Sequence, residues 1–394
     1  MQGLSERRIK MDRQFIRDKS TFLAYLMLAF YGYCLNIFGP ITPFLKEELA
    51  LSYTVAGFHF SAFAAGMIAA GFAGHRVIRA AGARKALWLG AFGLSMSAVL
   101  VAAGRHAAVT IAASFLMGLI GSLVLSVVPA MLTDRHGEDR TVAFLEANVV
   151  ASIVSAAAPV LVGLFASTAL GWRAALAVAP LFPIAMRLGF GKIDLPQASR
   201  ESAPREGRHP LPARYWVFWL AIVLSVSVEF CMVFWSADFF VSVRGMQKAT
   251  ASQSVTIFLA GMVLGRLAAG RVVRRFSPHA LVTACVLIAA AGFLIFWVSP
   301  NPVLGAVGLF ITGFGVAGLY PLNLSMAMGA AGDETAQAGS RAALASGLAI
   351  FTLPLLLGRL ADAAGIRAAY GIVLVLAAAV LVINLATARG RRQA

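Results

Sequence analysis

Glu229 is the residue whose type and setting most clearly point to chemistry. It stands in the middle of an apolar stretch over residues 215–242, in SVSVEFCMVFWSADFF. A carboxyl group at the centre of a bilayer costs roughly 2.5–3.5 kcal/mol, so it normally faces a cavity or a polar partner. We expect Glu229 to bind and release a proton, the alternative being a structural hydrogen bond to a neighbouring helix. Ser225 and Ser236 share its helical face.

Asp238 lies nine residues after Glu229 in the same stretch. On a continuous helix this spacing places it about 180° around the axis and roughly 13 Å further along. The two carboxyl groups therefore cannot form one site unless the helix breaks. Two roles stay open for Asp238: a second proton site, and a capping or gating acid near the end of the helix.

Polar side chains in two other apolar stretches are spaced to face one direction. Tyr33 and Asn36 are three residues apart in the first stretch, and Tyr320 and Asn323 are three apart in a later one. Residues at this spacing share a helical face. They could contact a bound solute or hydrogen-bond to another helix, and the pattern favours neither.

No pattern typical of an enzyme or a metal site occurs in the sequence. The six histidines are scattered, H-E-x-x-H is absent, and Cys34, Cys231 and Cys285 all lie in apolar stretches. The phosphate-binding loop G-x-x-x-x-G-K-[ST], which direct use of ATP would require, is also absent. We therefore expect neither an enzyme nor a bound metal or cofactor.

The composition indicates that these residues belong to a membrane protein. The chain of 394 residues is 60% hydrophobic and 13% charged, with a mean hydropathy of +0.82. A water-soluble domain of this size could not bury so much apolar surface. Stretches long enough to cross the roughly 30 Å hydrocarbon core recur along the chain. The twelve predicted spans are 21–45, 54–75, 86–104, 107–132, 142–167, 173–190, 215–242, 250–270, 280–299, 303–329, 339–363 and 368–388.

The second half of the chain repeats the first at an offset of 195 residues. Residues 65–79 read AGMIAAGFAGHRVIR and residues 260–274 read AGMVLGRLAAGRVVR, with seven identical positions. The offset also aligns Cys34 with Glu229. Repeated halves are typical of secondary transporters, and six spans per half give both halves the same orientation. We predict an all-α membrane protein of two six-helix bundles, related by a pseudo-two-fold axis, with a cavity between them.

The charged residues predict the topology. With the N-terminus in the cytoplasm, 25 of the 33 Lys and Arg residues lie on the cytoplasmic side and six lie in outer loops. This positive-inside bias places both termini in the cytoplasm. The net charge of +16 does not indicate nucleic-acid binding, because no soluble domain is present to provide it. The predicted parts are an N-terminal arm (1–20), a first bundle (21–190), a linker rich in Pro, Ser and charge (191–213), a second bundle (214–388) and a tail (389–394).

Twelve spans in a six-plus-six repeat, short basic loops after spans 2 and 8, and a central linker resemble the major facilitator superfamily. The stretch Gly71-Phe-Ala-Gly74-His75-Arg76, with Ala80-Ala-Gly82-Ala-Arg84-Lys85 after it, is similar to that family's loop motif, roughly G-x-x-x-D-R-x-G-R-[RK]. The glycines and basic residues are present, but His75 or Gly74 stands in place of the acid. The resemblance implies that spans 1, 4, 7 and 10 line the cavity, which places Asn36 and Glu229 there. The subfamily stays unassigned.

The resemblance also implies a gate, because the family packs span 5 against span 8 and span 11 against span 2. Glu146 and Arg341 are aligned by the repeat near the ends of spans 5 and 11. Glu146 would then meet Arg266 or Arg271, and Arg341 would meet the loop that lacks its acid. The alternative is that these side chains extend to the membrane surface from helix ends. The gating candidates are Glu146, Arg266, Arg271, Arg341, His75 and Arg76.

These features favour a secondary transporter, driven by an ion gradient with protons preferred, that moves a small organic solute by alternating access. No arginine lies near the middle of spans 1, 2, 4, 7 or 10. The expected cavity therefore favours efflux of amphipathic or cationic compounds slightly over uptake of a neutral or zwitterionic metabolite. A solute sensor that does not transport is the third possibility. The expected partners are the solute and the lipid bilayer, for a monomer in a bacterial-type inner membrane.

Overall fold

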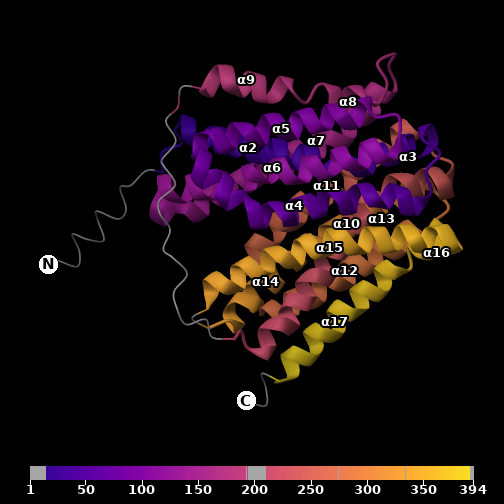
Figure 1. Cartoon of the computed structure of the whole chain (residues 1–394). Helices are drawn as coiled ribbons and strands as arrows, with labels where there is room; N and C mark the ends of the chain where they lie inside the picture. Colours follow the sequence, from indigo (N-terminus) through magenta and orange to yellow (C-terminus); the bar gives the residue numbers. More distant parts are fainter. Residues whose placement is uncertain (1–14, 192, 194–209, 274, 333, 391–394) are drawn as a thin grey trace.

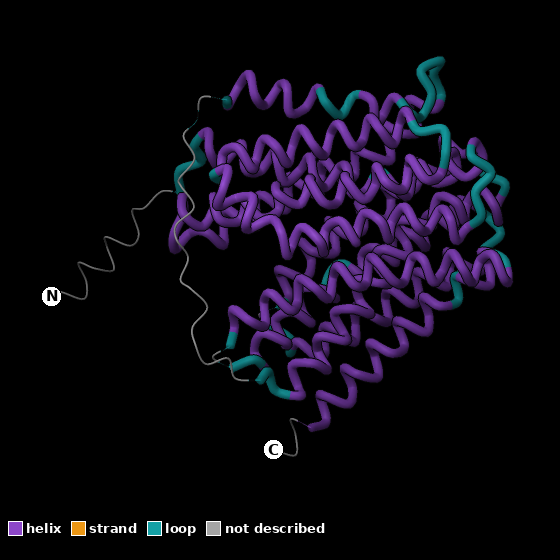
Figure 2. The backbone as a smooth tube through the Cα atoms, viewed as in Figure 1, coloured by secondary structure: helices purple, strands orange, loops and turns teal. Residues whose placement is uncertain are grey.

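The computed structural model describes residues 15–191, 193, 210–273, 275–332 and 334–390. Every regular element in this part of the chain is a helix (Figure 2). Most of the predicted arm and linker, and the last four residues of the tail, lie outside the described residues. Eleven helical segments are long and apolar enough to cross a membrane, and a shorter apolar segment, Ala174–Phe190, stands at the position of the sixth predicted span. The protein is therefore a multi-pass membrane protein.

The helices follow the predicted spans in order. The first half contains α2 (Lys19–Asn36), α3 (Phe38–Glu48), α4 (Tyr53–Ala81), α5 (Ala83–Ala103), α6 (Ala107–His136), α7 (Arg140–Ala166), α8 (Ala174–Ala177) and α9 (Leu181–Phe190), with a 3-10 turn, η1 (Gly137–Asp139), before α7. The second half contains α10 (Ala213–Arg244), α11 (Lys248–Val272), α12 (Pro278–Val298), α13 (Pro302–Val316), α14 (Leu319–Ala330), α15 (Thr335–Ala364), α16 (Ile366–Ala369) and α17 (Ile372–Gly390).

Prolines account for the breaks in spans 1 and 10. A proline inside a helix has no N–H to donate, and its ring clashes with the carbonyl four residues earlier. Pro40 acts on the carbonyl of Asn36, where α2 ends, and Pro321 acts on that of Ala317, directly after α13. Spans 1 and 10 are thereby each divided into two helices.

The two halves form two groups of helices that lie side by side (Figure 1). At one end lie the start of α2, the end of α9, the start of α10 and the end of α17; we call this the linker end. There the halves spread apart in the view, whereas they meet at the opposite end, which we call the far end. The main contacts between the halves are those of α4 with α15, of α7 with α11, and of α3 with both α10 and α11.

Glycines set the closest helix contacts inside each half, and the repeat conserves them. A methyl group at Gly118 of α6 would meet the backbone carbonyl of Phe63 in α4. At the equivalent position in the second half, a methyl group at Gly313 would meet the backbone carbonyl of Phe258. Because only glycine permits this approach, the two halves are built around the same backbone contact.

The family-like motif after span 2 is helical rather than a loop. α4 continues to Ala81, and only Gly82 separates it from α5. Gly82 has φ +80, in the left-handed region that favours glycine. His75 and Arg76 consequently lie exposed on the last turns of α4. The prediction that span 2 ends at residue 75 was short by more than one turn.

Candidate functional site

A cavity of about 230 Å³ lies between the two halves and contains Glu229. Its lining comes from α2 and α7 of the first half and from α10 and α11 of the second. The predicted partners Asn36 and Glu229 both line it, so the structure places these two residues together. Asn36 also donates a hydrogen bond from its side-chain nitrogen to the carbonyl of Gly32, 2.9 Å away.

Arg266 of α11 is the cation next to Glu229. Its Nη2 lies 3.9 Å from Oε1 of Glu229, and its Nη1 donates to the hydroxyl of Ser152, 3.2 Å away in α7. The Glu229 side chain is 18% exposed and that of Arg266 is 45% exposed. The cavity therefore carries a carboxyl group and a guanidinium group that touch only loosely and remain open to a solute.

In this conformation the position of Arg266 differs from two expectations. It was expected to meet Glu146 across the seam between spans 5 and 8, and instead it faces Glu229. The sequence also predicts a cavity without an arginine, because none lies near the middle of spans 1, 2, 4, 7 or 10. Arg266 belongs to span 8, and its long side chain reaches the cavity from there.

Tyr33 does not face the cavity. Its hydroxyl donates to the carbonyl of Ala175 in α8, 2.7 Å away, which fastens α2 to its own half. Tyr31 lines the cavity instead, together with Leu28 and Leu35. These three residues follow a helical spacing of three and four, so the periodicity of α2 could have identified Tyr31.

Four of the other predicted site residues lie within the second half. Asn323 donates to the hydroxyl of Ser225, 3.2 Å away, and to the carbonyl of Leu319, 2.9 Å away, so it connects α14 to α10. Ser236 is fully buried, and its hydroxyl has no hydrogen-bond partner among the described residues. Tyr320 is half-buried on α14, within electrostatic range of Glu229.

Glu146 is held by its own half. Arg17 donates to it through Nε at 2.9 Å and Nη2 at 2.6 Å, and the Tyr25 hydroxyl donates at 3.1 Å. Arg271 donates to the carbonyl of Leu267 in its own helix. The expected contact between Glu146 and Arg266 or Arg271 is therefore not formed in this structure.

The N-terminal segment around Arg17 is attached to the first half by a second ion pair. Asp18 caps α2 by accepting from the N–H of Thr21 at 2.9 Å, and it lies 2.5 Å from Arg135. Burial opposes ionisation of Asp18, but the hydrogen bonds from Thr21 and the charge of Arg135 outweigh it and lower the pKa of this carboxyl group. Arg17 and Asp18 together hold the start of α2 against α6 and α7.

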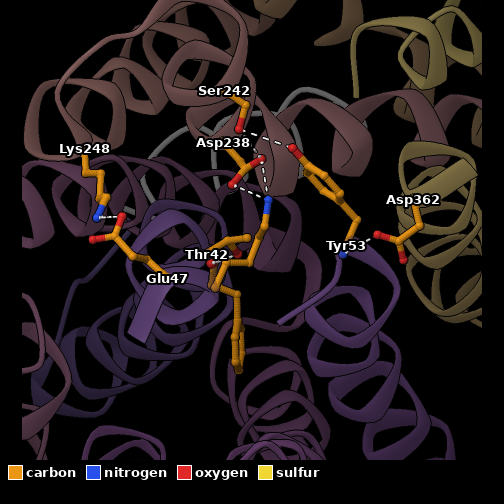
Figure 3. Close-up of polar contacts among 9 residues, drawn as sticks. Thr42, Glu47, Tyr53, Asp238, Ser242, Lys248 and Asp362 are labelled. Atoms are coloured by element: carbon orange, nitrogen blue, oxygen red, sulfur yellow. Dashed lines mark hydrogen bonds and ion pairs between the residues drawn. The ribbon is translucent and has the colours of Figure 1, made fainter. Parts of the chain in front are cut away.

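The far end is closed by a buried ion pair between the halves (Figure 3). Nζ of Lys46, in α3, lies 3.1 Å from both carboxylate oxygens of Asp238, in α10. The Asp238 side chain is 3% exposed and that of Lys46 is 15% exposed. Lys46 also lies over the ring of Tyr53, whose hydroxyl donates to Ser242. Of the two roles left open for Asp238, this geometry favours the gating acid.

Two further polar contacts surround this ion pair. Asp362 of α15 accepts hydrogen bonds from the backbone N–H groups of Tyr53 and Thr54, at 2.7 and 2.8 Å, and so caps the start of α4 from the other half. Glu47 pairs with Lys248 at the surface (Figure 3). Nothing in the local sequence around Asp362 indicates this contact, because its partners are backbone groups of another span.

An aromatic layer separates the ion pair from the cavity. Phe60 of α4 stacks on Phe234 of α10 with ring centroids 4.2 Å apart, and it meets Trp235 edge-on at 5.4 Å. All three side chains are buried. Access to Glu229 from the far end is thus blocked first by the ion pair and then by the rings.

Arg341 lines a second cavity, of about 490 Å³, at the seam between α4 and α15. Gly71 and Phe72, which belong to the family-like motif, line the same cavity, whereas His75 and Arg76 are exposed further along α4. Among the described residues, Arg341 makes no ion pair. No group of three or more His, Cys, Asp and Glu side chains in the described part of the chain could hold a metal ion.

Comparison with known proteins relates this fold to transporters. The sequence model of the Major Facilitator Superfamily matches residues 24–279 and 244–393. An uncharacterized MFS-type transporter of Yersinia pestis is 28% identical over 134 residues, which is 34% of each chain. The chain therefore aligns with about a third of the length of this curated relative.

Several solved structures share the fold at low sequence identity. A bacterial homolog of the human lysosomal transporter Spinster, in an inward-facing and occupied conformation, superposes with a TM-score of 0.77 at 13% identity, covering 94% of this chain and 96% of that one. A nucleoside transporter superposes at 0.75 with 13% identity, covering 93% and 98% of the two chains. A D-xylose-proton symporter superposes at 0.72 with 15% identity, covering 93% and 96%.

The family match spans nearly the whole chain, and the paired six-span halves agree with it. This protein belongs to the major facilitator superfamily of transporters.

Proposed function

We propose that this transporter moves a small organic solute by alternating access and that a proton gradient drives it through Glu229. The observation that carries the proposal is the combination of Glu229 in a cavity between the halves with a sealed far end. An acid in such a place can exchange its proton with only one side of the membrane at a time. No cofactor is needed for this cycle.

The linker end is proposed to face the cytoplasm of a bacterial-type inner membrane. The excess of Lys and Arg on the predicted cytoplasmic side supports this orientation. The described conformation is then inward-facing, with its outer side closed by Lys46 and Asp238. The protein is proposed to act as a monomer, because each chain contains both halves of the cavity.

Arg266 can couple the protonation of Glu229 to the binding of the solute. Two unit charges 3.9 Å apart interact by up to about 4 kcal/mol at the effective dielectric of a protein surface. When Glu229 takes up a proton, this attraction disappears and Arg266 can turn to an anionic group of the solute. When Glu229 releases the proton, it competes for Arg266 again and favours release of the solute.

The pair of opposite charges favours a neutral or zwitterionic solute. Arg266 can receive a carboxylate group of the solute, and the carbonyl oxygen of protonated Glu229 can accept a hydrogen bond from its ammonium or hydroxyl group. Efflux of amphipathic or cationic compounds is the second candidate, supported by the apolar lining that Leu28, Leu259 and Met262 provide. The sequence favoured efflux because it predicted a cavity without an arginine, and Arg266 contradicts that prediction.

The test of proton coupling uses proteoliposomes that contain a pH-sensitive dye. Amino acids, nucleosides and quaternary ammonium compounds are added in turn, and the first solute that moves protons is then used radiolabelled. Glu229→Gln should abolish accumulation driven by a pH gradient while leaving counterflow exchange. Asp134→Asn, which changes an exposed acid of α6, is the matched control and should leave both activities. Unchanged pH-driven accumulation in Glu229→Gln would exclude the proposed role.

The same experiment separates transport from sensing. A solute that binds and yet never exchanges in counterflow would support the sensor. Direction is tested by comparing proteoliposomes in both orientations of the pH gradient. Solute accumulation while protons flow out of the liposome indicates antiport, as expected for efflux. Solute accumulation while protons flow into the liposome indicates symport, as expected for uptake.

We propose that Glu146 changes partners during the cycle. In the present state it binds Arg17 of its own half. When the linker end closes, α7 and α11 approach, and Arg266 or Arg271 can replace Arg17. Arg341 and the segment with His75 and Arg76 would approach each other at the other seam, without an acid to pair them.

A further inference from the structure

The cavity that contains Arg341 has part of its lining in common, through the repeat, with the Glu229 cavity. The offset of 195 pairs Met67 with Met262 and Ile68 with Val263, and these residues line the two cavities at equivalent places. The cavity at the α4–α15 seam is the larger, at about 490 Å³ against about 230 Å³. One binding function is already proposed for the smaller cavity, which leaves the larger one unassigned.

The two cavities differ in how their arginine is neutralised. Arg266 lies 3.9 Å from the carboxylate of Glu229, whereas none of the described residues that line the larger cavity is acidic. Among the described residues, Arg341 is the only charged one in the lining of the larger cavity. In the described part of the chain its guanidinium forms neither an ion pair nor a side-chain hydrogen bond. The described part of the protein thus places a cation at this cavity without an anion to pair with it.

The remaining lining is mostly apolar and has room. Ile68 of α4, Leu125 of α6 and Leu344 of α15 contribute aliphatic side chains. A methyl group at Gly71 would meet no atom within 4 Å, so this side of α4 borders open space. An apolar cavity with one cation complements a molecule that has an apolar body and a single negative group.

We propose that the cavity between α4, α6 and α15 binds an amphipathic carboxylate, that is, an alkyl or aryl chain with one carboxylate group. The guanidinium of Arg341 receives the carboxylate in the paired geometry that these two groups favour. The chain packs against Ile68, Leu125 and Leu344. α4 and α6 belong to the first half and α15 belongs to the second, so the bound molecule contacts both halves at the seam. Binding does not depend on whether Glu229 couples transport to protons.

Protection of a cysteine tests the site directly. Ser126 is exposed in the cavity lining, and Ser126→Cys is labelled with a water-soluble maleimide in lipid nanodiscs. Cys285→Ala is included in the background, since the other two native cysteines are buried. Decanoate should slow labelling at least tenfold. Decylamine, which has the same chain and the opposite charge, and acetate, which lacks the chain, should not slow it.

Substitutions separate the contribution of the Arg341 charge from that of the space for the alkyl chain of the ligand. Arg341→Gln should remove protection by decanoate, and Arg341→Lys should keep part of it. Arg359→Gln, which alters an exposed arginine of the same helix, α15, is the matched control and should keep all of it. Gly71→Leu should block the cavity and remove protection while Arg341 remains. Leu145→Cys, exposed elsewhere on the first half, should label at the same rate with and without decanoate.

Three results would overturn the proposal. The first is equal protection by decanoate and decylamine, and the second is protection by decanoate that persists in Arg341→Gln. Either result would mean that the cavity recognises only the alkyl chain of the ligand. Absence of any protection in the parent would mean that the cavity does not bind this class. A folded state of each variant is checked by its melting temperature, and Arg341→Lys keeps the test valid if Arg341→Gln fails to fold.

Discussion

Breaking the buried ion pair at the far end should open that end of the transporter. In Asp238→Asn the carboxylate is lost, and Lys46, whose side chain is only 15% exposed, is left as an unpaired charge. Removing one partner of a buried ion pair destabilises it by roughly 3–5 kcal/mol. Lys46 keeps its contact with the ring of Tyr53, so we expect the lower end of this range.

The magnitude can be expressed as a population. A difference of about 3 kcal/mol changes an equilibrium constant by roughly 150-fold, at about 1.36 kcal/mol for each factor of ten. The ratio of open to closed far ends should rise by this factor in Asp238→Asn. The exposed pair between Glu47 and Lys248 provides the contrast, because the Glu47 side chain is 69% exposed. Glu47→Gln should change the ratio by at most about fivefold, since surface pairs contribute roughly 0–1 kcal/mol.

The assay is the distance between spin labels on the two halves. Leu170→Cys and Val303→Cys are both 70% exposed positions near the far end, one in each half. Asp238→Asn should move the distance distribution to longer values, and Glu47→Gln should leave it nearly unchanged. Adding Lys46→Met to Asp238→Asn should restore the shorter distance, because no unpaired charge remains. An unaltered distribution in Asp238→Asn would refute the reasoning, as would an equal effect of Glu47→Gln.

Three further predictions concern the linker end and the interior. Arg17→Gln frees Glu146 and should shift the linker end toward closure, seen as a shorter distance between labels on α7 and α11; a shift toward opening would contradict the exchange of partners. Gly118→Ala should lower the free energy of unfolding by roughly 1–3 kcal/mol because it overpacks α4 against α6, whereas Gly270→Ala, with open space around it, should not lower the melting temperature. Asn323→Leu should reduce stability and leave solute affinity unchanged, because Asn323 connects helices and does not line the Glu229 cavity; a selective loss of affinity would argue against this.

The features that were predictable from the sequence are those that one helix or one repeat determines. Apolar length predicted the spans, and the 195-residue repeat predicted two equivalent halves. Asn36 and Glu229 were placed at the same depth by the repeat, and both line the cavity. Periodicity also predicted that Asn323 has a polar role, without deciding between solute and neighbouring helix.

The contacts that were not predictable depend on how helices turn relative to one another. The face of α2 that meets the cavity holds Tyr31 and not Tyr33, because the rotation of a helix is set by its neighbours. Arg266 reaches the cavity from span 8, which is not one of the spans predicted to line it, through the length of its side chain. Lys46 and Asp238 are 192 residues apart. Such pairs become visible only when the two halves are docked.

The cap that Asp362 places on α4 has a consequence for hydrogen exchange. The first N–H groups of a helix have no partner within the helix, and here those of Tyr53 and Thr54 are satisfied by a carboxylate from the other half. Separation of the halves at the far end must return both groups to water. Their amide protons should then exchange with deuterium at a rate set by the opening of that end. Exchange at these two backbone groups of α4 would therefore measure how often the far end opens, without an attached probe.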